Sequence, residues 1–296
     1  MGVSLPMLRH LISLKELGAL KGDVLLLGRM SPMFNTRMLK RTLLKEGLDR
    51  PFVSSKGYEN IFRHNPSDVE VFKSLGFSRV YSLDVSSYEG ADFVWDLNLP
   101  VPENLKNKFD FIYDGGTIEH IFNTPQVLKN LHDLLHPTGY IFHENPANNF
   151  VDHGYYQFSP SLFFDYYTAN NYEIISALLC KVFRRKNRSY LAYNYLPNRF
   201  EAYSYGRWSG TMLSNVVVVR KTSMSTSGKF SQQSRYEELF WGGISSPISS
   251  ERESFKKQLA RKFPKMRYWY IRFRRPIFET INGLIARSKP KPDMKL

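Results

Sequence analysis

The chain of 296 residues is long enough for one large domain with an extension, or for two small domains. Its hydrophobic residues (42%) and aromatic residues (15%) suffice for a substantial core, which excludes wholesale disorder. The single cysteine, Cys180, excludes an intramolecular disulfide and a cysteine-based metal site, and no apolar run approaches the roughly 20 residues of a spanning helix. We therefore expect a cytoplasmic protein with no integral membrane segment.

An alternation of strand and helix patterns begins near the N-terminus. The expected elements are, in order, helical residues 1–20, a strand at 24–28, a helix at 34–46, a polar loop at 49–65, a helix at 67–75 that opens with a capping box (Ser67 and Glu70), and strands at 79–83 and 91–95. The regular alternation predicts an α/β protein with a largely parallel sheet.

Residues 109–146 form the most informative stretch and predict a strand–helix–strand unit. A buried strand at 109–113 ends in the turn Asp114-Gly115-Gly116, where the backbone can bend tightly or let a ligand approach. Thr124 is the expected N-cap of the next helix, which Pro137 and Gly139 end, and a strand follows at 140–143. Further on we expect a helix at 159–167, strands at 172–181 and 214–220, and a Ser/Thr-rich linker at 221–233.

The order of motifs in this stretch resembles that of the class I S-adenosylmethionine-dependent methyltransferases, in the variety with Glu-His after the fourth strand. It reads FD, apolar strand, EH, helix, leucine pair, Pro-x-Gly, strand, Pro. Residues 148–164 resemble a subgroup that acts in bacterial surface-polysaccharide pathways. The resemblance implies a Rossmann-like, mostly parallel seven-stranded sheet with an antiparallel last strand, and S-adenosylmethionine as cofactor. We expect this domain at 1–222, a linker and docking segment at 223–250, and a basic helical tail at 251–296.

The same resemblance assigns cofactor-binding residues to the ends of the predicted strands. They are Gly28 after the first strand, Asp84 for the ribose hydroxyls, Asp96 and Leu97 for the adenine, and Asp114, Gly115 and Glu119 after the fourth strand. On its own, Asp84 also fits a turn-starting residue before Ser86. The loop GRMSPMFN keeps Gly28 but lacks the further glycines that are usual there, which departs from the family pattern.

Methyl transfer to a hydroxyl group requires a general base, and histidines near the predicted strand ends are the candidates. His153 is the first candidate because its loop should border the acceptor, and His143 and His120 follow. His120 is also consistent with capping the next helix or packing under it. Some relatives bind a metal through Glu-x-x-Glu-His, but Gly116 stands in place of the first Glu, so we expect no metal.

The net charge of +14 is concentrated near the C-terminus. Residues 251–296 hold 14 Lys plus Arg against 4 acids (+10), which leaves 27 against 23 (+4) for the first 250 residues. Apolar residues recur there at steps of three and four, so we expect a helix lying on an anionic membrane surface, at the inner face of the membrane. A basic helix packed on its own protein, or solvated, fits equally well.

These observations predict a methyltransferase that O-methylates a small molecule, a saccharide or a lipid-linked glycan. A second hypothesis is a scaffold that keeps the fold without binding cofactor, because of the unusual GRMSPMFN loop. A third is an RNA methyltransferase, because of the charge, although residues 1–250 carry too small an excess for nucleic acid to be the expected partner. No pattern predicts an oligomeric state.

Overall fold

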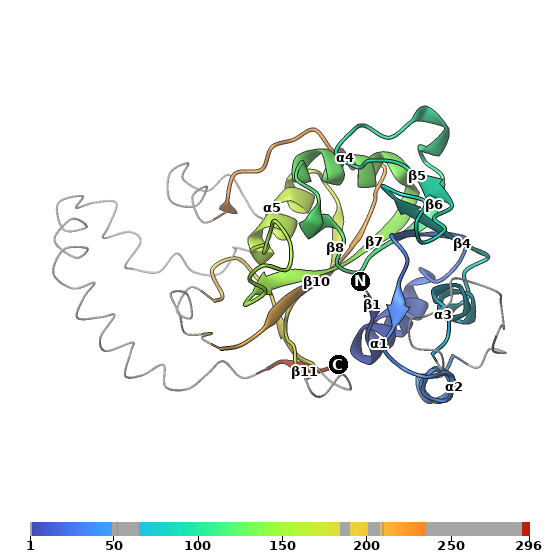
Figure 1. Ribbon diagram of the computed structural model, residues 1–296. Helices are drawn as coiled ribbons and strands as arrows, with labels where there is room; N and C mark the ends of the chain where they lie inside the picture. The colour runs from blue at the N-terminus through green and yellow to red at the C-terminus, as the bar shows by residue number, and fades with distance from the viewer. Residues whose placement is uncertain are drawn as a thin grey trace, which may run out of the picture. The chain divides into compact units, whose positions relative to one another are not determined.

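A nine-stranded sheet organises the part of the chain that the structure describes. The computed structural model describes residues 2–48, 52, 65–183, 190–200, 208, 210–234 and 292–296. The strand order is β11-β9-β8-β10-β7-β6-β2-β4-β5 (Figure 1). The strands are β2 (Asp23–Leu27), β4 (Arg79–Asp84), β5 (Phe93–Val94), β6 (Phe109–Asp114), β7 (Leu135–Asn148), β8 (Glu173–Lys181), β9 (Leu191–Asn194), β10 (Leu213–Arg220) and β11 (Met294–Lys295).

The five strands β5, β4, β2, β6 and β7 are parallel, and β10 runs antiparallel to both of its neighbours. After β2 the chain continues to β4 on one side of the sheet, and after β6 it continues to β7 on the other side, so the strand order reverses between β2 and β6. In an open α/β sheet, ligands bind at the point where the strand order reverses, beyond the carboxyl ends of the strands. This arrangement is Rossmann-like. The expected count of seven strands was too low, because β9 and β11 extend the sheet beyond β8.

Helices cover both faces of the sheet (Figure 1). The helices α1 (Leu5–Ser13), α2 (Thr36–Lys45) and α3 (Asp68–Leu75) pack on one face, and α4 (Thr124–Leu134) and α5 (Pro160–Ala169) on the other. In β2, Val24 and Leu26 belong to the first core, whereas Leu25 and Leu27 belong to the second. The alternation explains the unbroken apolar run of this strand, since it is buried from both sides.

Three short 3₁₀ turns complete the described helical structure: η1 (Leu14–Leu17), η2 (Glu103–Leu105) and η3 (Ile118–His120). The capping box of α3 is confirmed, with the Ser67 hydroxyl accepting from the Glu70 amide and the Glu70 carboxylate accepting from the Ser67 amide. For α4 the prediction was wrong by one residue. Asn123 is the N-cap and accepts from Gln126 N, because an Asn side chain accepts this bond at least as well as Thr.

The end of α4 and the length of β5 also differ from the prediction. The helix α4 ends at Leu134, ahead of the expected stop at Pro137, because residue 135 already pairs with Phe109 of β6. The third strand, expected at 91–95, is reduced to the two residues of β5 at the sheet edge.

A small parallel pair of strands lies apart from the main sheet and was not predicted. The strand β1 (Gly2–Val3) pairs with β3 (Ser31–Pro32), which belongs to the loop after β2. Ser4 then caps α1 by accepting a hydrogen bond from Met7 N. The start of the chain is thus fixed next to the GRMSPMFN loop.

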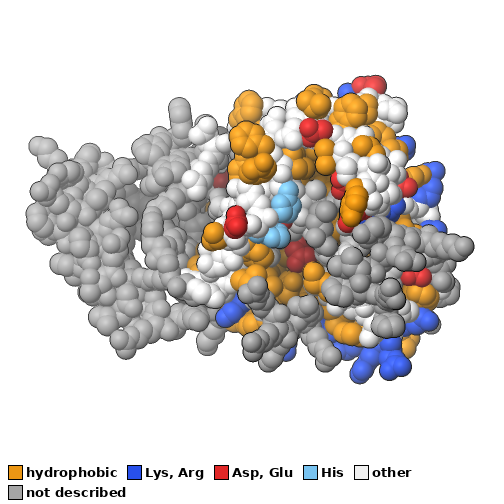
Figure 2. Space-filling view, viewed as in Figure 1, with side chains coloured by type: hydrophobic (Ala, Val, Ile, Leu, Met, Phe, Trp, Pro, Cys, Tyr) orange, Lys and Arg blue, Asp and Glu red, His pale blue; other side chains and the backbone are white. Residues whose placement is uncertain are grey.

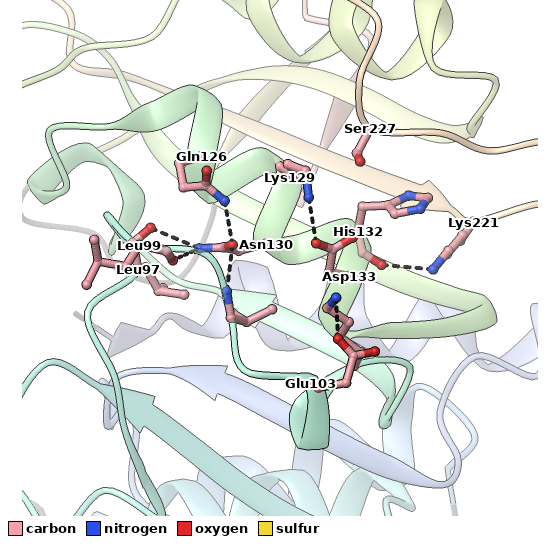
Figure 3. A network of polar contacts seen from close by, with 12 residues as sticks. Leu97, Leu99, Glu103, Gln126, Lys129, Asn130, His132, Asp133, Lys221 and Ser227 are labelled. Atoms are coloured by element: carbon pink, nitrogen blue, oxygen red, sulfur yellow. Dashed lines mark hydrogen bonds and ion pairs between the residues drawn. The ribbon is translucent and has the colours of Figure 1, made fainter.

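The predicted linker at 221–233 begins with residues bound to the domain. Lys221 is only 6% exposed, and its ammonium group donates to the carbonyls of His132 and Leu135. Figure 3 shows the bond to His132. Further along, Thr226 N donates to the Asn170 carbonyl at the end of α5. One structural unit accordingly includes residues 1–196, 210–231 and 292–296.

The predicted polar loop, except Phe52 and Asn65, lies outside the described residues, as do residues 235–250 of the predicted docking segment and residues 251–291 of the predicted tail. The prediction of a helical tail is wrong at its end, because Met294 and Lys295 form the strand β11, which pairs with β9. Within the described ranges, no helix combines the length and the hydrophobicity that crossing a bilayer requires.

Candidate active site

The ends of the first, second and third parallel strands bring together the residues predicted to bind the cofactor. Gly28 follows β2 with φ 78°, a left-handed conformation that favours glycine, and its amide donates to the Leu83 carbonyl in β4. Asp84 ends β4 beside it and is partly exposed. Its Oδ1 accepts from Ser86 N at 3.1 Å, as in the predicted turn. A carboxylate has about four acceptor positions, so this turn leaves capacity for a ligand.

Asp96 and Leu97 follow β5 and are held by α4. The Asp96 carboxylate accepts from both the backbone and the side-chain nitrogen of Asn98. Asn130 is fully buried on α4, and its Nδ2 donates to the carbonyls of Leu97 (2.9 Å) and Leu99 (2.8 Å), as Figure 3 shows. Sequence reasoning missed Asn130. Its only signal was a polar residue within the apolar stripe of the helix, a position that demands hydrogen-bond partners.

The loop after β2 is closed by interactions with its surroundings. Arg29 forms ion pairs with Asp68 (3.7 Å) and Asp92 (3.5 Å), and Met30 N donates to the Asp68 carboxylate. Burial raises the pKa of the Asp68 carboxyl, against the opposing effect of Arg29. Arg29, which follows Gly28, therefore stands in the loop where the family pattern has further glycines that leave room for a ligand.

The turn after β6 is equally crowded. A Cβ added to Gly115 would lie 3.0 Å from the Met30 sulfur and 3.3 Å from the Gly2 carbonyl oxygen of β1. The Thr117 hydroxyl donates to the Leu27 carbonyl at the end of β2. A ligand that approached Gly115 from this side would have to displace β1 and Met30, so this part of the predicted cofactor site is filled.

A buried polar network occupies the carboxyl ends of β6 and β7. Asp114 and His143 are fully buried, and His143 Nδ1 lies 2.8 Å from Asp114 Oδ2. On the other side of the ring, Nε2 lies 2.7 Å from the Tyr167 hydroxyl. Both ring nitrogens of His143 are thereby engaged away from solvent. Asn145 Nδ2 extends the network by donating to Asp114 (2.9 Å) and to Glu119 (3.1 Å).

Glu119, His120 and His153 form a cluster at the outer end of this network. The Glu119 side chain is completely buried, whereas the side chains of His120 and His153 are 42% and 49% exposed. Glu119 Oε1 lies 3.6 Å from His153 Nε2 and 3.9 Å from His120 Nε2, and the two rings are 5.1 Å apart. Burial and the nearby charge of Asp114 raise the pKa of Glu119 to about 7. Burial and His153 lower the pKa of His120.

The predicted residues therefore divide into two groups. Gly28, Asp84 and Asp96 lie at the β2–β4–β5 end of the edge, and Glu119, His120 and His153 at the β6–β7 end. Histidine side chains are exposed on the face shown in Figure 2, beside hydrophobic and acidic side chains. An acid–base cluster next to a candidate nucleoside site could act on a ligand held between them.

No protein-family model matches the sequence, and a search of curated proteins found no match. Solved structures that it matches include the 1,6-didemethyltoxoflavin-N1-methyltransferase of Burkholderia thailandensis, which holds 1,6-didemethyltoxoflavin and S-adenosylhomocysteine (14% identity, 73% of this chain and 78% of that chain, TM-score 0.37). Another is the YcgJ protein of Bacillus subtilis (12% identity, 72% of this chain and 99% of that chain, TM-score 0.39). A third is an S-adenosylmethionine-dependent methyltransferase of Aquifex aeolicus (13% identity, 70% of this chain and 87% of that chain, TM-score 0.34). At TM-scores below 0.5, these similarities establish neither the fold nor the function of this chain.

Proposed function

We propose that this protein is an S-adenosylmethionine-dependent methyltransferase that O-methylates a saccharide or a lipid-linked glycan. The observation that carries the proposal is the position of Gly28, Asp84 and Asp96, which follow three neighbouring parallel strands beside the reversal of strand order. These are the positions at which the class I methyltransferase pattern expects cofactor contacts. Asp84 would accept hydrogen bonds from the ribose hydroxyls, and Asp96 from the adenine amino group.

In the reaction, the acceptor oxygen would attack the methyl group of the sulfonium. The C–O bond forms as the C–S bond breaks, S-adenosylhomocysteine leaves, and the hydroxyl proton passes to a base. His153 is the favoured base, because its exposed imidazole lies next to the buried Glu119 carboxylate, which would stabilise the imidazolium. We do not propose His143 as the base, because both of its ring nitrogens form hydrogen bonds inside the domain.

Exposed aromatic side chains beside the cluster support a saccharide acceptor. Phe122 and Tyr155 are 71% and 70% exposed, and their rings meet edge to face at 5.9 Å. Each follows a histidine of the cluster by two residues, and Phe150 contacts the His153 ring at 5.8 Å. Solvent-exposed aromatic faces next to a catalytic group suit the apolar face of a sugar ring.

Calorimetric titration with S-adenosylhomocysteine tests the proposal. We expect the wild-type chain to bind, and Asp84→Ala to lose on the order of 1.5–3 kcal/mol of binding free energy through its missing hydrogen bonds. Glu103→Ala removes an acid from the exposed η2 turn and should bind like the wild type. Equal affinity of the wild type and Asp84→Ala would refute the cofactor assignment.

A second candidate function is a scaffold that has the fold but binds no cofactor. The packing of β1 and Met30 against Gly115 favours it, because these groups fill the space that a cofactor would enter beside the turn. Under this hypothesis the wild-type chain releases no heat with S-adenosylhomocysteine. A deletion of residues 1–3 separates the two hypotheses further, since it should strengthen binding if β1 merely covers the cofactor site.

We also propose that residues 251–291 attach the protein to an anionic membrane surface, as their charge of +10 (13 Lys plus Arg against 3 acids) and apolar periodicity suggest. Residues 292–296 are left out of this proposal because they belong to the domain that carries β11. Replacing Arg272, Arg274 and Arg275 together with Glu, in the full chain, reverses three charges. The wild type should sediment with phosphatidylglycerol vesicles but not with phosphatidylcholine vesicles, and the triple variant should sediment with neither. Equal sedimentation with both lipids would contradict an electrostatic attachment.

A further inference from the structure

Two segments that are far apart in the sequence converge on one point of the surface. Glu119 and His120 belong to the η3 turn after β6, and His153 to the loop after β7. One side-chain ligand atom from each of the three lies within 4.8 Å of the other two. Glu119 Oε1 is the centre of the group, at 3.6 Å and 3.9 Å from the two imidazole nitrogens.

Glu119 Oε1 is buried and has no hydrogen-bond partner among the described residues. The other oxygen of the carboxylate, Oε2, accepts from Asn145 Nδ2 at 3.1 Å, so the orientation of the group is fixed. An isolated buried carboxylate oxygen is costly, and it is satisfied either by a proton or by a cation. Here the unsatisfied oxygen points at two nitrogen ligands.

The loop that carries His153 is fastened to the η3 turn by its backbone. Tyr156 N donates to the Glu119 carbonyl at 3.1 Å, and the Tyr156 hydroxyl donates to the Phe122 carbonyl at 2.8 Å. A Cβ added to Gly154 would come within 2.9 Å of the Glu119 carbonyl oxygen and 3.1 Å of His120 Nδ1. The close approach of the two segments thus requires a glycine at 154, and the ligands are held together before any ion binds.

We propose that Glu119, His120 and His153 bind a divalent first-row transition metal ion. One carboxylate and two imidazoles are a common ligand set for Zn²⁺, Fe²⁺ and other divalent first-row transition metal ions, and three protein ligands leave coordination positions open. Ligand atoms about 2.0–2.1 Å from a tetrahedral Zn²⁺ are about 3.3–3.4 Å apart, so the observed spacing needs only small side-chain movements. The open positions face solvent, because both imidazoles are about half exposed.

This inference replaces the expectation from sequence that no metal binds, which rested on Gly116 in place of a glutamate. With an ion bound, His153 is a ligand instead of a free base. A hydroxyl of the acceptor that occupies an open position becomes more acidic, and its proton passes to solvent water. Metal binding itself does not depend on methyl transfer, so the two proposals can fail separately.

The test uses the full chain without an affinity tag, treated with chelator and dialysed. Titration with Co²⁺ should produce visible absorption bands that saturate at one ion per chain, and calorimetry with Zn²⁺ should give the same stoichiometry. Glu119→Gln, His120→Ala and His153→Ala should each weaken binding by about tenfold or more. His136→Ala removes an exposed histidine elsewhere and should bind like the wild type.

Two further measurements separate a lost ligand from a lost fold. His120 and His153 are half exposed, so both alanine variants should keep the circular dichroism spectrum and thermal midpoint of the metal-free wild type. Gly154→Ala keeps every ligand but pushes the loop away from Glu119, and should also weaken binding. The proposal is overturned if the wild type binds neither ion, or if folded His120→Ala and His153→Ala bind as tightly as His136→Ala. In either case, titration with S-adenosylhomocysteine still decides the methyltransferase proposal.

Discussion

Replacement of Asp114 by alanine should destabilise the protein more than any other removal of a single carboxylate from β6. Asp114 is fully buried and accepts from His143 Nδ1 (2.8 Å), Asn145 Nδ2 (2.9 Å), Thr117 N (3.0 Å) and Ile118 N (3.4 Å). In Asp114→Ala, Asn145 retains its bond to Glu119, but His143 Nδ1 and the amides of Thr117 and Ile118 lose the acceptor that Asp114 supplies.

The size of the effect follows from those stranded donors. A buried donor without a partner costs about 1–3 kcal/mol, so the two buried donors, His143 Nδ1 and Ile118 N, cost about 2–6 kcal/mol together. Asp114 also repels the Glu119 carboxylate, and its removal relieves that repulsion. We therefore expect the lower half of the range, about 3 kcal/mol, which is a large part of the 5–15 kcal/mol that stabilises a typical domain.

Urea denaturation followed by circular dichroism measures this difference. Asp110→Ala is the matched control, because Asp110 lies on the same strand but, among the described residues, accepts a hydrogen bond from Asp23 N alone. Its loss should cost about 1 kcal/mol. Asp114→Asn keeps an acceptor oxygen but turns an amide toward His143, so it should fall between the two. A loss for Asp114→Ala no larger than for Asp110→Ala, at an unchanged urea slope, would refute the network argument.

Three further changes test other parts of the structure. Burial lowers the pKa of His10 to about 4, so the unfolded chain takes up a proton first, and the folded state loses stability as pH falls from about 6.5 to 4. His10→Asn should reduce the drop in urea midpoint between pH 7 and pH 4.5, and an equal drop would contradict this. Lys221→Met should cost about 2 kcal/mol, because the buried carbonyl of Leu135 and the partly buried carbonyl of His132 lose their donor, and an unchanged urea midpoint would count against it. Asn130→Leu should cost at least as much, because it releases the segment after Asp96; a neutral effect would show that this segment needs no anchor.

Much of the fold could be predicted because local sequence signals agree with the final structure. The apolar run at 24–28, the capping box of Ser67 and Glu70, and the strand–helix–strand pattern after Phe109 each specify an element without reference to the rest of the chain. The exceptions are elements whose stability comes from distant partners. The two-residue strands β1 and β11 have no periodicity to detect, and they exist because residues 31–32 and 191–192 supply their hydrogen bonds.

The candidate site could be predicted residue by residue but not as an arrangement. His153 and Glu119 were both chosen from the sequence, yet only the folded loop brings His153 Nε2 to 3.6 Å from the buried carboxylate oxygen. The metal argument from Gly116 considered neighbours in sequence, whereas the third potential ligand comes from the loop after the next strand. His143 differs from His153, because this histidine beside a strand end forms a fully buried link between Asp114 and Tyr167.

The distribution of buried polar groups is itself an argument for function at this edge. Asp114, Glu119, His143 and Asn145 are at most 1% exposed, and all four lie at the carboxyl ends of β6 and β7 or in the turn that follows. A core of apolar residues would be at least as stable, because ionisable groups lose their hydration on burial. Glu119 Oε1 lies beside two half-exposed imidazoles and has no hydrogen-bond partner among the described residues. The free energy lost when this oxygen is buried is therefore not offset by a hydrogen bond within that part of the chain. A ligand that binds this oxygen, whether a metal ion or an acceptor proton, would recover it, which is why the strand ends of β6 and β7 are the place to look for chemistry.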